Sequence, residues 1–315
     1  MQNLLVASTG GHLLELFGLR TRMLPKTDGV VWVTSDSKQS RSLLAGEEVI
    51  FVPEVVPRGY RAVATNARGA RRVLRETGAE QVISTGAGIA LAFLPLARAT
   101  GLQCHYIESA ARMDGPSMTG RLLRSARAAH LYAQHAEWAQ SPWLYQGSVF
   151  DDLEVLPRRS TGRIRRVVVT LGTLHYPFDR LVRCLQAALP SDAEVLWQLG
   201  FEPGIRLSGR VERSLDHHEL AAEMEGADLV VCHGGVGSAL LAFSVGQCPV
   251  LVPRRVAFGE HVDDHQSQVA SMLAERGLAV TCEADELQEH HLQAAAALRI
   301  RTTDHPHPFM LARQG

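Results

Sequence analysis

The sequence contains no apolar run that is long enough to cross a membrane. Its longest apolar stretch covers residues 89–97, which is about half of the length that a bilayer requires, and Pro95 interrupts it. The first residues reach a glycine turn after a short apolar segment, so they also have neither the basic start nor the long apolar stretch of a signal peptide. We therefore expect a cytoplasmic protein whose contact with a membrane, where there is one, is peripheral.

The sequence also has no excess of charge and no paired cysteines. Among 315 residues, the formal net charge is −1, 46% of the residues are hydrophobic and 21% are charged. This composition is typical of an ordinary soluble protein and does not favour nucleic acid as a partner. The five cysteines show no CxxC spacing, and four of them lie in or beside apolar runs. They indicate buried thiols in a reducing compartment and no metal site.

Positive charge is nevertheless concentrated in the first half of the chain. Between residues 58 and 127, eleven arginines stand against four acidic residues. A solvated helix face is the plainer interpretation of such a stretch. The functional interpretation is attraction to anionic lipid headgroups or to a phosphorylated acceptor.

Short apolar runs rich in Val, Ile and Leu alternate with longer helix-like stretches along most of the chain. The runs cover residues 3–8, 30–35, 48–53 and 81–85, and then residues 165–172, 194–200, 228–234 and 249–254. Continuous apolar runs suit strands that are covered on both faces, and their alternation with helices predicts parallel sheets. The predicted fold class is therefore α/β, with two Rossmann-like domains.

The boundary between these domains is predicted near residue 160, because residues 145–166 mix Gly, Pro, Ser and charged residues without a helical period. We expect a first domain over residues 1–160 and a second over residues 161–315, whose tail could cross back to the first. Ligands of doubly wound sheets bind outside the carboxyl ends of the strands. The site is therefore expected in a cleft across which the two domains face each other.

The segment CHGGVGSALL places a glycine-rich turn between a predicted strand and a predicted helix. Gly234, Gly235 and Gly237 have no Cβ atom, and the helix start offers free backbone N–H groups and a positive dipole end. The hydroxyl of Ser238 adds a donor, so the turn suits a diphosphate. The structural alternative is a tight turn that Ser238 caps and in which His233 is satisfied locally.

A polar cluster follows the next predicted strand. Asp264, His265 and Gln266 stand at the start of a helix whose apolar residues recur at helical spacing. Sugar hydroxyls need many directional hydrogen bonds, and these side chains supply acceptors and an amide. An acidic first turn that complements the helix dipole would explain Asp264 but not the pair that follows it.

These segments resemble those of a known enzyme family. CHGGVGS, PVLVPR and GEHVDDHQSQVA, in this order, are similar to the donor-binding half of GT-B nucleotide-sugar glycosyltransferases, close to the C-terminal domain of the lipid II-forming peptidoglycan transferase. VVVTLGTLHYPFDRLV resembles the start of the catalytic subunit of the two-subunit transferase that adds the second N-acetylglucosamine to dolichol diphosphate. STGGHLLEL, STGAGIAL and YIESAARMDGPSMTGRLL resemble its membrane-recruiting partner. The chain looks like both subunits fused, as in bacterial exopolysaccharide glycosyltransferases.

The resemblance implies an inverting transfer in which an acceptor hydroxyl attacks the anomeric carbon and a nucleoside diphosphate leaves, with no metal and no tightly bound cofactor. His12 is the first candidate for the base, because its ordinary pKa suits proton transfer near neutrality and Gly10 and Gly11 let the substrate approach. Glu108 is the second, since it could act directly or orient His12. Ser109 is placed on the acceptor side. A helix-start donor and a structural carboxylate are the alternative roles of His12 and Glu108.

For the diphosphate of the donor, the resemblance implies binding by backbone groups of Gly172 and Thr173 and of the glycine turn. His233 contacts a phosphate or braces the turn. Arg254 and Arg255 follow a strand and could meet a phosphate or an acidic sugar.

For the rest of the donor, Gln266 and Asp264 are implied sugar contacts, with His265 a further one. Leu241 stands where many relatives carry a glutamate that binds ribose, and a leucine cannot accept a hydrogen bond from a ribose hydroxyl. The nucleotide sugar, a co-substrate, could therefore carry UDP or dTDP.

Two other functions are compatible with the sequence. One is an enzyme like the UDP-N-acetylglucosamine 2-epimerases, and the other is a noncatalytic protein that binds nucleotide sugars or acts as a scaffold. The acceptor is left open between a lipid-linked saccharide and a small natural product.

Overall fold

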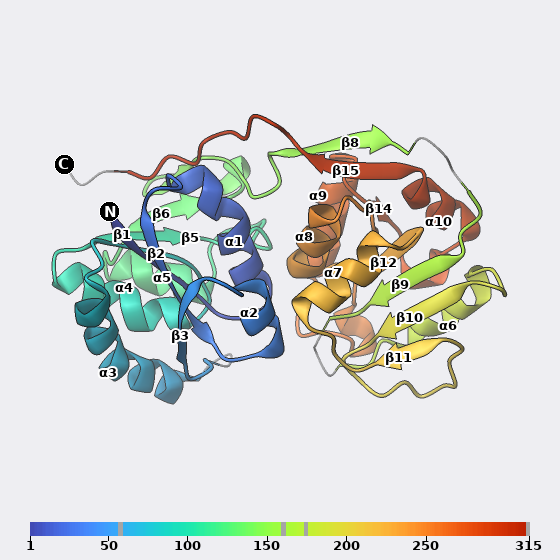
Figure 1. The fold of residues 1–315 in the computed structure, drawn as a ribbon, viewed down its shortest axis with the longest axis horizontal. Helices are drawn as coiled ribbons and strands as arrows, with labels where there is room; N and C mark the ends of the chain where they lie inside the picture. Colours follow the sequence, from blue (N-terminus) through green and yellow to red (C-terminus); the bar gives the residue numbers. More distant parts are fainter. Residues whose placement is uncertain (56–58, 159–161, 173–175, 313–315) are drawn as a thin grey trace. The chain divides into compact units, whose positions relative to one another are not determined.

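The computed structural model describes residues 1–55, 59–158, 162–172 and 176–312. The chain divides into two compact units, one formed by Met1–Asp151 with His305–Gly315 and the other by Asp152–Asp304. The division falls before the expected boundary at residue 160, because the strand β8 (Leu153–Pro157) pairs antiparallel with β15 (Leu298–Thr302) of the second unit. Figure 1 shows these two strands side by side.

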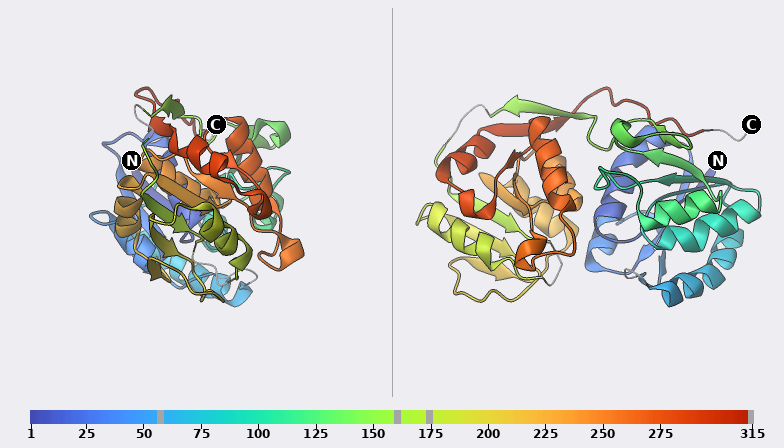
Figure 2. Two further views of the ribbon diagram at one scale, coloured as in Figure 1. Left: turned by 90° about the vertical axis from the view of Figure 1, so that its right-hand side faces the viewer. Right: turned by 180° about the vertical axis from the view of Figure 1, so that it is seen from behind.

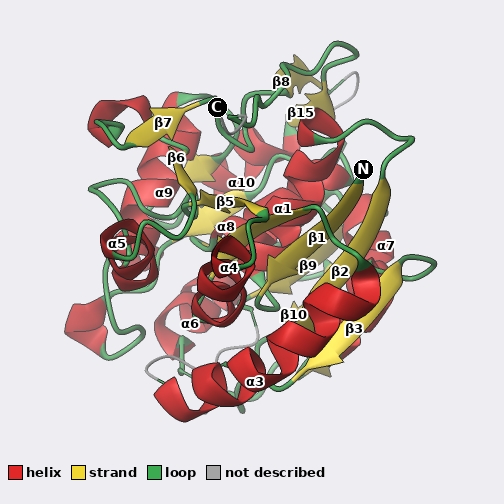
Figure 3. Ribbon diagram, turned by 90° about the vertical axis from the view of Figure 1, so that its left-hand side faces the viewer, coloured by secondary structure: helices red, strands yellow, loops and turns green. Residues whose placement is uncertain are grey.

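In the described residues, the first unit contains a seven-stranded parallel sheet with the order β3-β2-β1-β4-β5-β6-β7. The strands are β1 (Gln2–Ala7), β2 (Gly29–Ser35), β3 (Glu48–Val52), β4 (Gln81–Gly86), β5 (Gln103–Ile107), β6 (His130–Ala133) and β7 (Trp143–Tyr145). The helices are α1 (Gly11–Met23), α2 (Lys38–Leu43), α3 (Tyr60–Thr77), α4 (Ile89–Ala99) and α5 (Met118–Ser125). Helices α3, α4 and α5 cover one face of this sheet and α1 and α2 the other (Figures 1 and 3).

The second unit contains a six-stranded parallel sheet with the order β11-β10-β9-β12-β13-β14 in its described part. The strands are β9 (Arg166–Thr170), β10 (Glu194–Gln198), β11 (Arg210–Glu212), β12 (Leu229–His233), β13 (Val250–Val252) and β14 (Val280–Thr281). The helices are α6 (Asp179–Ala188), α7 (His217–Glu225), α8 (Val236–Ser244), α9 (His265–Glu275) and α10 (Glu289–Ala296). Helices α6 and α10 lie on one face and α7, α8 and α9 on the other (Figure 1). The predicted α/β class with two parallel sheets is confirmed.

The apolar runs become strands because both faces of each sheet are buried. In the first unit, β1 supplies Leu4 and Val6 to a core that includes Phe93 of α4, and in the second unit β9 supplies Val167 and Val169 to a core that includes Leu292 of α10. Side chains that alternate between two covered faces must be apolar on both, which produces continuous rather than alternating runs.

The C-terminal segment returns to the first unit after β15 (Figure 2). Phe309 is 1% exposed, and its ring lies 5.5 Å from that of Tyr132. The backbone N–H of Phe309 donates to the carbonyl of Arg22 at 3.1 Å, and the N–H of Ala312 donates to the Tyr132 hydroxyl at 2.8 Å. The segment is therefore held by one buried ring and by hydrogen bonds at Phe309 and Ala312.

None of the helices in the described part of the chain is both long enough and apolar enough to cross a membrane.

Candidate functional site

In each unit, the predicted site residues lie where the strand order reverses. Strand β1 has β2 on one side and β4 on the other, and β9 has β10 on one side and β12 on the other. At such points the loops that leave the two central strands diverge to opposite faces, so a ligand can reach the carboxyl ends of the strands. His12 follows β1, and the glycine turn of residues 233–238 follows β12.

His12 is fixed at the start of α1 by Thr85 near the end of β4. Gly10 precedes the helix with a φ of 85°, which favours glycine, and the His12 Nδ1 atom lies 2.8 Å from the carbonyl oxygen of Thr85. The Thr85 hydroxyl donates to the His12 carbonyl at 2.7 Å. Because a carbonyl oxygen only accepts, Nδ1 must carry the proton, which leaves the Nε2 lone pair available as a base.

The surroundings of His12 also keep its ring neutral. Burial lowers the pKa of His12, the Thr85 carbonyl opposes this effect, and the positive charge of Arg112 lowers the pKa further. A neutral imidazole with a free Nε2 is the form that takes a proton from an acceptor hydroxyl.

Glu108 is 1% exposed, and both oxygens of its carboxylate accept hydrogen bonds from neighbouring residues of the same segment. Its Oε1 accepts hydrogen bonds from the Tyr106 hydroxyl at 3.0 Å and the Ser109 N–H at 3.2 Å. Its Oε2 accepts from the N–H and the hydroxyl of Ser117 at 2.9 and 3.0 Å. Burial raises the pKa of Glu108. These contacts tie residues 106–117 together, so they favour the structural role of Glu108 over an orienting role on His12, whose ring contacts Thr85 instead.

The sequence analysis missed a second buried carboxylate in this unit, that of Glu15. It lies three residues after His12 on α1, is 1% exposed, and accepts a hydrogen bond at 2.7 Å from the hydroxyl of Ser109. A charged residue among the leucines of STGGHLLEL was the available signal. The expected acceptor-side residue Ser109 is thus held by Glu15 in the structure.

The turn after β12 packs around His233. This side chain is 8% exposed, and its Nδ1 lies 3.3 Å from the Ser238 hydroxyl. Gly172 has a φ of 75°, and a Cβ atom added there would lie 2.8 Å from the His233 ring. Burial, and then the charge of Arg254, lowers the pKa of His233 to about 3. A neutral, enclosed ring favours the bracing role over that of a cationic phosphate ligand.

The helix start after this turn has the features predicted for an anion site. Gly235 directly precedes α8, and Gly237 and Ser238 lie in its first turn, where N–H groups have no partner within a helix. A Cβ atom added at Gly234 would lie 2.7 Å from the carbonyl oxygen of Gln266, so only glycine lets α9 approach this closely. Leu241 is 5% exposed along α8. Thr173, predicted to bind the diphosphate with Gly172, lies outside the described residues.

Arg254 is completely buried and joins the loops of the second unit. Its guanidinium donates to the carbonyl of Tyr176 at 2.7 Å and to that of Leu171 at 3.0 Å, and it lies over the ring of Phe178 at 4.9 Å. Burial lowers its pKa to about 10, so it keeps its charge at neutral pH. Arg255 forms an ion pair with Glu283. Arg254 is therefore enclosed by protein groups and Arg255 is paired with one, and the expectation that they meet a phosphate or an acidic sugar stays a prediction.

The polar cluster at the start of α9 is divided in role. Gln266 is 7% exposed, and its Oε1 accepts from the Arg254 N–H at 3.1 Å. Asp264 is exposed and accepts from the Val256 N–H at 3.1 Å, and the His265 Nδ1 lies 3.2 Å from Gln268 Oε1. The side chain of Gln266 thus positions the Arg254 backbone, which sequence reasoning did not foresee.

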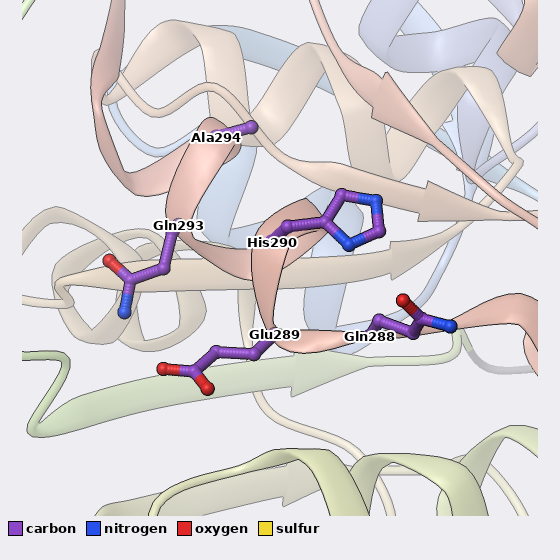
Figure 4. Close-up of a pocket in the computed structure, with 5 residues that line it drawn as sticks. All are labelled: Gln288, Glu289, His290, Gln293 and Ala294. Atoms are coloured by element: carbon purple, nitrogen blue, oxygen red, sulfur yellow. The ribbon is translucent and has the colours of Figure 1, made fainter.

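A shallow pocket lies elsewhere on the second unit, at the start of α10 (Figure 4). It is lined by Gln288, Glu289, His290, Gln293 and Ala294, which all come from one short segment. None of the predicted site residues is among them. In the part of the chain that the structure describes, no group of three or more His, Cys, Asp or Glu residues could hold a metal ion.

Comparison with known proteins gives a family match for most of the second unit. Residues 166–299 match the glycosyltransferase family 28 C-terminal domain, and this range contains the glycine turn, Arg254 and the start of α9. Together with the relatives and solved structures below, this match supports a GT-B nucleotide-sugar glycosyltransferase. The predicted enzyme class is confirmed, and the epimerase-like and noncatalytic alternatives lose their support.

This chain matches one relative over most of its length and two others over a part of it. It is 28% identical to the UDP-N-acetylglucosamine--N-acetylmuramyl-(pentapeptide) pyrophosphoryl-undecaprenol N-acetylglucosamine transferase of Xylella fastidiosa (strain M12), over 92% of this chain and 85% of that protein. The enzyme of the same name from Azoarcus sp. (strain BH72) is 38% identical over 25% of this chain and 21% of its own length. The UDP-N-acetylglucosamine transferase subunit ALG13 of Yarrowia lipolytica (strain CLIB 122 / E 150) is 31% identical over 38% of this chain and 66% of that subunit.

The fold is shared with solved glycosyltransferase structures. That of MurG from Acinetobacter baumannii matches with a TM-score of 0.54 and 18% identity, over 93% of this chain and 89% of that one. The predicted relation to the lipid II-forming transferase is thus confirmed from sequence and from fold.

Proposed function

We propose that the protein transfers a sugar, with inversion, from a UDP- or dTDP-sugar to a hydroxyl group of a lipid-linked saccharide. The observation that carries this proposal is the fixed tautomer of His12, whose Nδ1 is bound to the Thr85 carbonyl. The acceptor oxygen attacks the anomeric carbon, its proton passes to His12 Nε2, and the bond from the anomeric carbon to the nucleoside diphosphate breaks. A single displacement with one base inverts the anomeric centre.

The leaving diphosphate would be stabilised without a metal. The first-turn N–H groups of α8 and the positive end of its dipole favour an anion, and the buried charge of Arg254 acts on the same turn, as its effect on the pKa of His233 indicates. A lipid-linked acceptor is supported by the relatives whose names specify a pyrophosphoryl-undecaprenol substrate. The buried Leu241 gives no support to either nucleotide, so both stay in the proposal.

A transfer assay tests this function directly. The protein is incubated with UDP-N-acetylglucosamine or a panel of UDP- and dTDP-sugars, together with an undecaprenyl diphosphate-linked saccharide, and nucleoside diphosphate release is measured beside the product mass. We expect release that depends on the acceptor, and a product of inverted configuration by NMR. Release that is equal without any acceptor would indicate a hydrolase and contradict the proposal.

We also propose that the first unit contacts the membrane peripherally through α5. Met118 is 65% exposed and Leu122 is 43% exposed on this helix, and Arg121 and Arg124 are exposed on it as well. Helix α3, which carries exposed arginines, lies on the same side of the sheet as α5 (Figure 3). An apolar pair surrounded by arginines has both components that attract an anionic bilayer surface.

Replacing Met118 and Leu122 with aspartate should lower binding to vesicles that contain phosphatidylglycerol by at least about tenfold, because it removes apolar area and adds negative charge. Vesicle co-sedimentation measures the binding, and transfer to a soluble acceptor should stay unchanged. The matched control is Val211→Asp in the second unit, whose side chain is also 43% exposed. Equal vesicle binding by the double variant and the wild type would remove α5 from the contact.

A further inference from the structure

The buried carboxylate of Glu15 has no role in the transfer chemistry described above. The other buried residues on its part of α1 are Leu13, Leu14, Leu16 and Leu19. A leucine at position 15 would therefore continue the packing without the cost of burying a charged or polar group. The hydrogen bonds of the carboxylate must therefore explain why a glutamate stands at this position.

The contacts of Glu15 all lead to the carboxyl ends of β5 and β6. The Ser109 hydroxyl donates to Oε1 at 2.7 Å, and the Ala110 N–H donates to Oε2 at 2.9 Å. The side-chain amide of Gln134 donates to the same Oε2 at 2.7 Å and also to the Glu108 carbonyl at 3.0 Å. The carboxylate of Glu15 thus fastens the first residues after β5 to the helix that carries His12.

The fastened residues form a turn that ends at Arg112. The Ser109 hydroxyl accepts from the Ala111 N–H at 3.2 Å, and the Ser109 carbonyl accepts from the Arg112 N–H at 2.9 Å. The Arg112 carbonyl in turn accepts from the Trp138 indole at 2.8 Å. The positive charge of Arg112 acts on His12. A chain of hydrogen bonds therefore runs from Glu15 through Ser109 to the backbone of Arg112, whose charge lowers the pKa of His12.

We propose that Glu15 is a positioning residue, which holds the turn of residues 109–112 on α1, the helix that carries His12, and thereby sets the place of Arg112. This inference rests on the proposed role of His12. The charged groups that act on the two side chains are Arg112 on His12 and Glu108 on Glu15. With the turn in place, the charge of Arg112 favours the neutral form of the base.

The test compares Glu15→Leu, Glu15→Gln, Ser109→Ala and Arg112→Gln. The pKa of His12 is measured by NMR from its Cε1–H resonance, assigned by its loss in His12→Gln, and kcat and KM are measured in the transfer assay. We expect Glu15→Leu and Ser109→Ala to raise the pKa of His12 in the same direction as Arg112→Gln. In Glu15→Leu, kcat/KM should fall at least about tenfold with the KM for the donor unchanged.

Glu15→Gln is the conservative control. Its amide oxygen can still accept from Ala110 and Gln134, and its NH₂ group can donate to the Ser109 hydroxyl, so kcat/KM should stay within about threefold of the wild type. In the Arg112→Gln background, Glu15→Leu should cause no further change in the pKa of His12. Ser109→Ala introduces no bulky side chain, and it keeps the test valid if Glu15→Leu does not fold.

The proposal is overturned if the pKa of His12 is the same in the wild type, Glu15→Leu and Ser109→Ala, or if Arg112→Gln leaves it unchanged. The NMR readout needs no substrate, so the two proposals can fail separately. A protein without transfer activity in which Glu15 still controls the pKa of His12 would contradict the proposed function and support the positioning role.

Discussion

Replacing His12 with alanine should lower kcat by roughly two to four orders of magnitude, the usual contribution of general-base catalysis, and leave donor affinity nearly unchanged. The Nδ1 proton is committed to the Thr85 carbonyl, so Nε2 is the atom that receives a proton, and alanine provides no replacement for it. The glycine turn that we propose to bind the diphosphate belongs to the other unit, so the substitution should leave it intact. Single-turnover transfer and calorimetric binding of the nucleoside diphosphate measure the two effects.

The rival base supplies the control for this result. Glu108 is surrounded by donors from Tyr106, Ser109 and Ser117, so Glu108→Gln should reduce activity far less than His12→Ala and act mainly on stability. The pH profile gives a second check. Because burial lowers the pKa of His12, kcat/KM should fall with acid only below the ordinary histidine range near 6.5. A variant of His12 that retains near wild-type turnover would remove this residue from the mechanism.

The parts of the site that the sequence predicted depend on local signals. The strand that ends at His233, the two glycines that follow it and the helix from Val236 are contiguous in the chain. Their order determines a turn with free N–H groups. The GGH turn at the first helix is equally local. For each of His12 and Gly235, one short local segment was therefore enough to place the residue after the carboxyl end of a strand.

The parts that the sequence did not predict depend on partners that are distant in the chain. Glu15 binds Ser109 and Gln134, and Arg254 binds the carbonyls of Leu171 and Tyr176. No periodicity or spacing connects such residues, because the contacts arise only when strands that are far apart in sequence become neighbours. For the same reason Arg254 was interpreted as a ligand-binding residue, although the structure encloses it.

The fold, too, has parts that local sequence signals predicted and parts that depend on partners distant in the chain. Long apolar runs such as that of β9 were predicted, whereas β8 was interpreted as an irregular boundary. The residues of β8 are mixed in polarity because the strand pairs only with β15, in a two-stranded ribbon that has one neighbour rather than two covered faces. Partial burial permits charged residues such as Glu154, which pairs with Arg301, and these weaken the strand signal.

The buried Arg254 leads to the second prediction, which concerns the stability of the donor unit. In Arg254→Met, the carbonyls of Leu171 and Tyr176 lose their donors. A buried acceptor without a partner costs on the order of 1–3 kcal/mol, so the free energy of unfolding should fall by roughly 2–5 kcal/mol. Part of this loss is offset because methionine removes a buried charge.

Donor binding should weaken together with stability, because the Arg254 guanidinium donates to the carbonyl of Leu171 after β9 and to that of Glu260 before α9, and brings positive charge to the glycine turn. We expect the affinity for nucleoside diphosphate to fall by roughly 10-fold to 100-fold, which corresponds to about 1.4–2.8 kcal/mol. Urea denaturation and calorimetry measure the two quantities. Arg255→Met is the matched control, since the partly exposed Arg255–Glu283 ion pair should contribute less than about 1 kcal/mol. Wild-type stability and affinity in Arg254→Met would show that the two loops hold their positions without this arginine.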